Sequence, residues 1–102
     1  MTIKRGDKAI FHKSDRPVFT HTLCGFTHNP NDELYRLDGN IVSVVRIVEA
    51  EYSQCDECGS IFHIEEQYKK FNILVLFCDE DYTTLFCVSD SELEKLEGVF
   101  DD

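Results

Sequence analysis

The sequence predicts a mainly β domain, a small barrel or antiparallel sheet followed by a C-terminal α-helix. Runs of β-branched and aromatic residues recur between turn residues along the chain. A helix-start pattern, Ser89 followed three positions later by Glu92, lies near the end. The length of 102 residues fits one domain, residues 1–102.

The first half of the chain is expected to be mostly strand. We expect strands at residues 8–12, 16–24, 34–37 and 41–52. Turn-forming residues predict a loop at 27–32, and Asp38-Gly39-Asn40 supplies a hairpin turn. Residues 41–52 give the longest β signal, because the stretch is dominated by Ile and Val.

The second half is expected to alternate strands with short helical segments. We expect strands at residues 60–64, 72–78 and 83–88, the last two joined by a turn at 79–82. Residues 65–71 fit one or two helical turns. The C-terminal helix is expected from about Asp90 to Glu97, with Ser89 and Glu92 as its capping box and Gly98 as its stop.

Two short motifs carry the chemistry. His21-x-x-Cys24-Gly25 is echoed by Cys55-x-x-Cys58-Gly59. A two-residue gap places both ligand atoms on one side of a tight turn, and the following glycine lets backbone NH groups point toward the sulfur. Zinc accepts imidazole nitrogen and thiolate together in tetrahedral geometry. We therefore predict a structural Zn²⁺ bound by His21, Cys24, Cys55 and Cys58.

The paired motifs resemble a zinc ribbon, in which two knuckles at the ends of β-hairpins bind one ion. The resemblance covers residues 21–59, with histidine in place of the first cysteine, and His28 or His63 are alternatives to His21. The opening residues 3–11, with a Gly-Asp turn before the first strand, resemble the start of small SH3-like barrels. Such barrels mostly serve as recognition modules.

The other two thiols, Cys78 and Cys87, are not expected to join the metal site. A four-residue turn at 79–82 pairs Cys78 with Thr83 and Cys87 with Leu74. At about 3.3 Å per residue this separates the two sulfurs by about 13 Å. One zinc needs its sulfurs within about 4 Å of each other. We expect both cysteines to pack as small hydrophobic residues of the core.

Catalysis is not predicted, although a thiol-dependent enzyme stays open as an alternative. A reactive dithiol needs positive surroundings, whereas Asp56 and Glu57 lie between the two cysteines and Glu51 lies nearby. The chain also lacks glycine-rich phosphate loops and nucleophile signatures. A chance Cys-x-x-Cys without metal is the remaining reading of this motif.

The charge is strongly negative and unevenly distributed. The net charge is −10, and residues 51–102 carry three Lys or Arg against fourteen Asp or Glu. Such a surface is expected to engage a basic protein. The candidate contacts are Asp79, Glu80, Asp81, Asp90, Glu92, Glu94 and Glu97. In size and charge the chain is similar to small acidic phage-encoded inhibitors that imitate DNA, although a merely solvated acidic face is equally compatible.

Direct nucleic-acid binding is the alternative, through an N-terminal basic patch on a zinc-ribbon module. That patch comprises Lys4, Arg5, Lys8, Lys13 and Arg16. No membrane association is expected, because no apolar run reaches the roughly 18 residues that a span needs. The cytoplasm is the expected compartment, where cysteines stay reduced or bind metal. The identity of the partner and the oligomeric state stay open.

Overall fold

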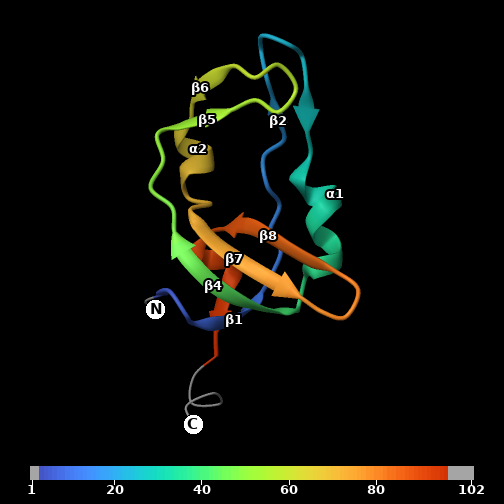
Figure 1. Ribbon diagram of the computed structural model, residues 1–102, viewed down its shortest axis with the longest axis vertical. Coiled ribbons are helices and arrows are strands. Elements are labelled where there is room, and N and C mark those ends of the chain that lie inside the picture. The colour runs from blue at the N-terminus through green and yellow to red at the C-terminus, as the bar shows by residue number, and fades with distance from the viewer. Residues whose placement is uncertain (1–2, 97–102) are drawn as a thin grey trace.

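Two small β-hairpins extend from a larger antiparallel sheet in this protein (Figure 1). The structure is a computed structural model that describes residues 3–96. Within this range, five strands form one sheet in the order β8-β7-β4-β1-β9. They are β1 (Lys8–Phe11), β4 (Ile41–Ile47), β7 (Ile73–Cys78), β8 (Thr83–Val88) and β9 (Leu93–Lys95). The predicted mainly β fold with antiparallel strands is confirmed.

Each hairpin belongs to a long segment between two strands of the sheet. The segment 12–40 contains β2 (Phe19–Thr20), β3 (Thr27–His28), α1 (Pro30–Leu34) and the 3-10 helix η1 (Tyr35–Leu37). The segment 48–72 contains β5 (Tyr52–Gln54), β6 (Ile61–His63) and α2 (Glu66–Lys69). The segments leave the sheet at opposite ends of β4, yet both hairpins lie at the same end of the molecule (Figure 1).

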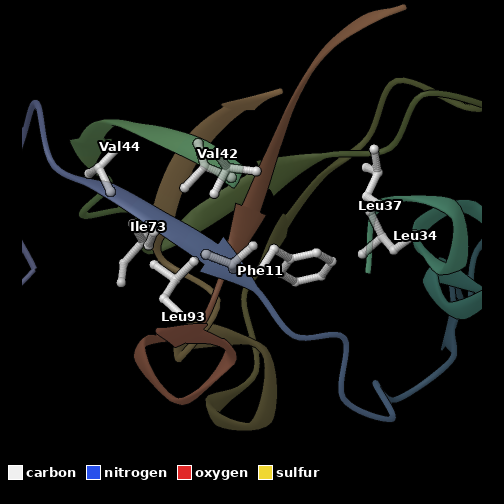
Figure 2. Close-up of a cluster of buried hydrophobic side chains, with 10 residues drawn as sticks. Phe11, Leu34, Leu37, Val42, Val44, Ile73 and Leu93 are labelled. Atoms are coloured by element: carbon white, nitrogen blue, oxygen red, sulfur yellow. The ribbon is translucent and has the colours of Figure 1, made fainter. Parts of the chain in front are cut away.

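The core lies on one face of the five-stranded sheet. Most strand residues on this face are fully or almost fully buried, whereas their neighbours along the strand are not: Val42 is 1% exposed and Ile41 is 50% exposed. Phe77 and Phe86 pack against the same cluster and are partly buried. This alternation follows from the two-residue period of a strand. The buried cluster comprises Ala9, Phe11, Leu34, Leu37, Val42, Val44, Ile73, Val75, Val88 and Leu93. Figure 2 shows Leu34 and Leu37 facing Phe11 from the helical segment.

The expected strand at 34–37 is wrong, since Pro30–Leu37 is helical. Asn29 caps α1 by accepting a hydrogen bond from the Asn31 backbone, and Pro30 occupies the first helical turn. Leu34 and Leu37, three residues apart, then lie on the same face of the helical segment and reach the core. Helical spacing of the two leucines thus overrides their local strand pattern.

The strand expected at 16–24 is reduced to Phe19–Thr20. The backbone of Arg16 is satisfied differently, because the Asn31 side chain accepts from its NH and donates to its carbonyl, both at 2.9 Å. The expected loop at 27–32 likewise contains β3 and the start of α1. The β signal at 41–52 is divided between β4 and β5.

The C-terminal α-helix predicted from Asp90 is also wrong for the described residues, and Glu97 and Gly98 lie outside them. The capping box of Ser89 and Glu92 is present, but it closes a single 3-10 turn, η2 (Asp90–Glu92). The chain then continues as β9, which pairs with β1 through Phe11–Leu93. Leu93 is buried where the chain pairs with the edge of β1, and this burial explains why the residues after Glu92 form a strand and do not continue as a helix.

The predicted hairpin of β7 and β8 is confirmed in its register. Cys78 pairs with Thr83, and Leu74 pairs with Cys87. Neither cysteine belongs to the buried core, however, because Cys78 is exposed and Cys87 is only partly buried. Both lie on the outer face of the sheet, so their packing role was predicted wrongly. The other predicted strands at 8–12 and 60–64, and the helical turn within 65–71, are confirmed.

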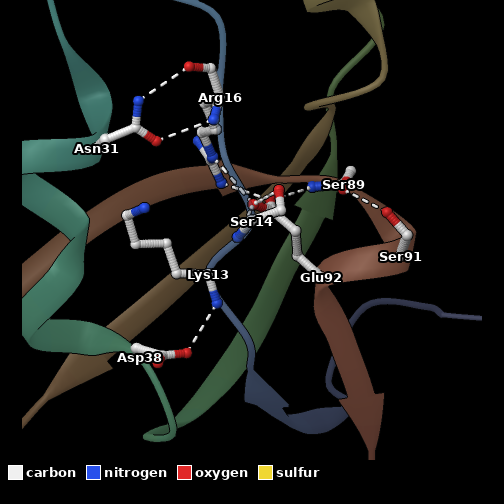
Figure 3. Close-up of polar contacts among 8 residues, drawn as sticks. All are labelled: Lys13, Ser14, Arg16, Asn31, Asp38, Ser89, Ser91 and Glu92. Atoms are coloured by element: carbon white, nitrogen blue, oxygen red, sulfur yellow. Dashed lines mark hydrogen bonds and ion pairs between the residues drawn. The ribbon is translucent and has the colours of Figure 1, made fainter.

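A buried ion pair fastens the segment 12–40 to the sheet. Arg16 Nη2 lies 2.6 Å from Glu92 Oε1, and their side chains are 8% and 0% exposed. The Ser14 hydroxyl donates to Glu92 Oε2 at 2.7 Å, and the Ser89 backbone NH donates to Oε1 at 3.0 Å (Figure 3). The Arg16 guanidinium also lies 4.4 Å from the centre of the Phe71 ring. These contacts tie three separate parts of the chain together.

No helix within residues 3–96 is long and apolar enough to cross a membrane.

We predict that Arg16→Ala lowers the free energy of unfolding by about 3–5 kcal/mol, because it leaves the Glu92 carboxylate buried without its cation. Urea denaturation followed by circular dichroism measures the change. Arg5→Ala is the control, since Arg5 is exposed and is expected to change stability by less than about 0.5 kcal/mol. Equal effects of the two substitutions would contradict the structural role of the pair.

The same carboxylate predicts a pH dependence. Burial raises the pKa of Glu92, but hydrogen bonds from Arg16, Ser89 and Ser14 outweigh it and lower the pKa below 4.5. A lowered folded-state pKa contributes stability above the unfolded-state pKa and loses it as the pH falls through the folded-state value. The stability difference between the wild type and Glu92→Gln should therefore be constant above pH 5 and shrink below about pH 4.5. A difference that grows on acidification would contradict this assignment.

Candidate metal centre

The two motifs form turns with the same backbone hydrogen bonds. In the first, the His21 NH donates to the Phe26 carbonyl and the Gly25 NH donates to the His21 carbonyl, both at 2.8 Å. In the second, the Cys55 NH donates to the Ser60 carbonyl at 2.9 Å and the Gly59 NH to the Cys55 carbonyl at 2.8 Å. The two turns are therefore equivalent knuckles.

Glycine has a specific function in each knuckle. Gly25 and Gly59 have φ angles of 76° and 75°, in the left-handed region that other residues rarely adopt. This conformation directs the backbone NH of the next residue toward the cysteine sulfur, from Phe26 to Cys24 and from Ser60 to Cys58. The role that the sequence predicted for these two glycines, to let backbone NH groups point toward the sulfur, is confirmed.

The hairpins bring the four predicted ligands together. The candidate ligand atoms of His21, Cys24, Cys55 and Cys58 all lie within 4.8 Å of one another. Nδ1 of His21 lies 3.3 Å from the Cys24 sulfur and 3.5 Å from the Cys58 sulfur. The sulfurs of Cys24 and Cys55 are 3.8 Å apart.

These separations match a tetrahedron around one ion. Bond lengths of about 2.3 Å to sulfur and about 2.0 Å to nitrogen place two tetrahedral sulfurs about 3.8 Å apart and nitrogen about 3.5 Å from sulfur. The cluster is thus close enough, and of the right donor types, to hold a metal ion. Four protein donors complete a tetrahedral shell, which is typical of structural rather than catalytic sites.

Aromatic side chains pack beside the cluster and orient its imidazole. His21 is 4% exposed and packs beside the rings of Phe19 and Phe62, with centroids 6.2 and 5.4 Å away. Phe19 and Phe62 themselves stack at 5.1 Å. His21 and Cys55 are buried, whereas Cys24 and Cys58 are exposed. The ligands therefore lie at the boundary between a small aromatic core and solvent.

The thiols differ in acidity because their neighbours differ. The Ser60 hydroxyl and the Ser60 backbone NH stabilise the thiolate and lower the pKa of Cys58 to about 6. The Phe26 backbone NH lowers the pKa of Cys24, but burial and the adjacent thiols of Cys55 and Cys58 outweigh it, so that this pKa is raised. A metal ligand must be deprotonated, and Cys58 meets this requirement near neutral pH.

Other candidate ligands lie outside the cluster. His28 lies 3.6 Å from Glu33, and His63 lies 3.4 Å from Glu51. Neither histidine therefore takes the place of His21. Sequence reasoning missed Ser60, which was assigned only to a strand, although its position directly after Gly59 is the signal for its hydrogen bond to Cys58.

The proposed acidic contacts do not form one continuous surface. Glu92 is buried in its ion pair with Arg16, so it is excluded from any such surface. Asp79 accepts hydrogen bonds from the backbone of its own turn, at Asp81 and Tyr82. The other candidates within the described residues are exposed and lie on separate elements. Glu80 and Asp81 lie in the turn between β7 and β8, Asp90 lies in η2, and Glu94 lies on β9, at the opposite edge of the sheet from β8. Glu97 lies outside the described residues.

The predicted basic patch also loses a member. Arg16 is committed to Glu92 and is almost fully buried, so it cannot contact phosphate. Lys4, Arg5 and Lys8 are exposed near β1, and Lys13 is partly buried. The geometry therefore gives the nucleic-acid alternative less support than the sequence did.

Comparison with known proteins adds no family. No protein-family model, no curated protein and no solved structure matches this chain.

We predict that Cys55→Ser abolishes stoichiometric metal binding, whereas Cys78→Ser leaves it unchanged. Cys55 is a buried member of the cluster, and Cys78 lies exposed on the outer face of the sheet. Elemental analysis of both purified proteins measures the metal content. Retention of a full equivalent of metal in Cys55→Ser would show that the cluster is not the binding site.

Proposed function

We propose that this protein is a non-catalytic binding protein with a structural zinc ion, which regulates a partner by engaging its basic surface. The observation that supports it most directly is the convergence of four nitrogen and sulfur donors from two distant segments. A Cys₃His set is a common structural zinc site, and it leaves no open position for a substrate or a reactive water. Zinc would therefore stabilise the ribbon without taking part in chemistry.

The identity of the ion follows from donor type. Soft thiolates exclude magnesium and calcium, which prefer oxygen donors, and a single tetrahedral sulfur-nitrogen site is suited to zinc. The low pKa of Cys58 fits the same assignment, because zinc requires thiolate. The lowered pKa therefore does not favour the thiol-dependent enzyme over a metal ligand.

The binding role is inferred from charge on a rigid scaffold. With a net charge of −10, the protein attracts basic surfaces and repels nucleic-acid backbones. Glu80 and Asp81 project from a turn that Asp79 stabilises with two backbone hydrogen bonds. Fixed carboxylates of this kind could imitate a phosphate backbone, as expected of a cytoplasmic inhibitor of a nucleic-acid-binding protein.

The zinc assignment predicts one zinc per chain in protein purified without added metal. Chelation should lower the melting temperature, since removal of the ion disconnects the two knuckles. Elemental analysis and calorimetry with and without chelator measure both effects. Iron in place of zinc, or a melting temperature unaffected by complete metal removal, would contradict the assignment.

The partner assignment is tested by capture from a lysate of the source organism with immobilised protein. We expect basic proteins that elute with salt, and no retention of duplex DNA. Three variants with the same charge change locate the surface: Glu80→Gln with Asp81→Asn, Asp90→Asn with Glu94→Gln, and the control Asp15→Asn with Asp32→Asn. One of the first two should lose capture while the control retains it. Equal capture by all three would count against these carboxylates.

A further inference from the structure

A cleft of about 630 Å³ lies between the two hairpins and α2, beside the metal cluster. Its lining includes the aromatic rings of Phe19, Phe62 and Tyr68. Figure 1 shows β2, β5, β6 and α2 gathered at this end of the molecule. The volume is within the range of about 300–1,000 Å³ that is typical of ligand sites. The proposed carboxylate surfaces on the sheet do not include this cleft.

Two of the three rings stack on each other, and the third stands nearly perpendicular to one of them. Phe19 and Phe62 stack with an interplanar angle of 21°, whereas Tyr68 stands at 87° to Phe19 with centroids 5.9 Å apart. The Tyr68 hydroxyl donates to the Val18 carbonyl at 3.2 Å, which holds α2 against the first hairpin. The face of an aromatic ring is electrically negative and attracts cations.

The charge around the rings has the same sign. Among the described residues that line the cleft, Glu65 is the carboxylate and none is Lys or Arg. The lining also includes His21, His28 and His63, and the last two lie 3.6 Å from Glu33 and 3.4 Å from Glu51. Lys69 on the neighbouring α2 lies 3.0 Å from Glu51 and 3.4 Å from Glu66, so its charge is offset by two carboxylates. Burial raises the pKa of Tyr68, and the nearby charge of Glu65 raises it further.

We propose that this cleft binds an arginine side chain presented by the basic partner. A guanidinium can stack on the rings while its NH groups donate to Glu65, whose Oε2 also accepts from the Gln67 side chain at 2.9 Å. A neutral side chain lacks the positive charge that strengthens both contacts. The inference rests on the proposed function, because the partner supplies the arginine. The proposal adds a defined partner contact at the two hairpins. The sequence alone suggested contacts only through the carboxylates of the β7–β8 turn and of the C-terminal region.

The position of the cleft couples it to the metal. His21 lines the cleft and also belongs to the ligand cluster, and the two hairpins that form the walls are joined through the same four residues. Removing the ion should let the hairpins separate. Arginine binding should therefore be lost on chelation and restored when zinc is added back.

The experiment is an NMR titration of the zinc-bound protein with N-acetyl-arginine amide, monitored at the Phe and Tyr ring signals. N-acetyl-citrulline amide is the matched control, since it has nearly the same shape without the charge. We expect arginine to shift the signals of Phe19, Phe62 and Tyr68 and citrulline to bind at least about tenfold more weakly. Equal binding of both compounds, or no ring shifts with arginine, would overturn the proposal.

Two matched variants locate the carboxylate. Glu65→Gln should weaken arginine binding several-fold, whereas Glu66→Gln should not, because the Glu66 side chain is 92% exposed and does not line the cleft. Equal effects of the two substitutions contradict a specific contact with Glu65. A single-stranded hexanucleotide is titrated in parallel, and ring shifts with it but not with arginine would identify a nucleobase site instead.

The two proposals fail separately. If basic proteins are captured while arginine leaves the rings unchanged, the binding function stands on another surface and the arginine site is wrong. If arginine binds as described but no basic protein is captured, the cleft is a cation site and the proposed regulatory function is wrong.

Discussion

The structure depends on the convergence of four side chains from two distant turns. Cys24 and Cys55 are separated by thirty residues of sequence, yet their sulfurs are 3.8 Å apart. The hairpins that carry them contain only short paired strands and a small set of buried aromatic contacts, which is too little to hold them together independently. A metal ion held by these four residues would replace the core that two hairpins of this size cannot form.

The five-stranded sheet is stabilised by a hydrophobic core and a buried ion pair, and not by the candidate metal cluster. The five-stranded sheet buries one apolar face against Leu34 and Leu37, and the pair of Arg16 and Glu92 fixes the exit of the first segment from the sheet. The first of the two hairpin segments is thus attached to the sheet by the ion pair of Arg16 and Glu92, and the two hairpins meet at the candidate metal cluster. This arrangement holds the aromatic cleft at a fixed position, which the proposed binding of an arginine side chain would require.

The sequence was most informative where spacing alone determines geometry. The knuckle motifs identified all four residues of the candidate metal cluster, because the two-residue gap and the glycine define the turn locally. The hairpin of β7 and β8 was likewise predicted with its register, because its turn and strand lengths are sufficient. Its thiols at Cys78 and Cys87 could therefore be separated from the metal ligands before the fold was known.

The errors arose where distant residues decide local structure. Ser89 and Glu92 form a capping box as predicted, but the preference of Leu93 for the edge of β1 cannot be read from the residues nearby. The burial of Glu92 depends on Arg16, 76 positions earlier. The aromatic cleft could not be predicted from the sequence either, because residues of both hairpins form it. Pairing across the chain is set by topology, and local patterns do not encode it.

The coordination shell of the bound metal tests the central claim most directly. X-ray absorption at the zinc edge of the purified protein should give three sulfur neighbours at about 2.3 Å and one nitrogen at about 2.0 Å. A shell with oxygen neighbours, or with fewer than three sulfurs, would contradict the account that one ion joins the two knuckles.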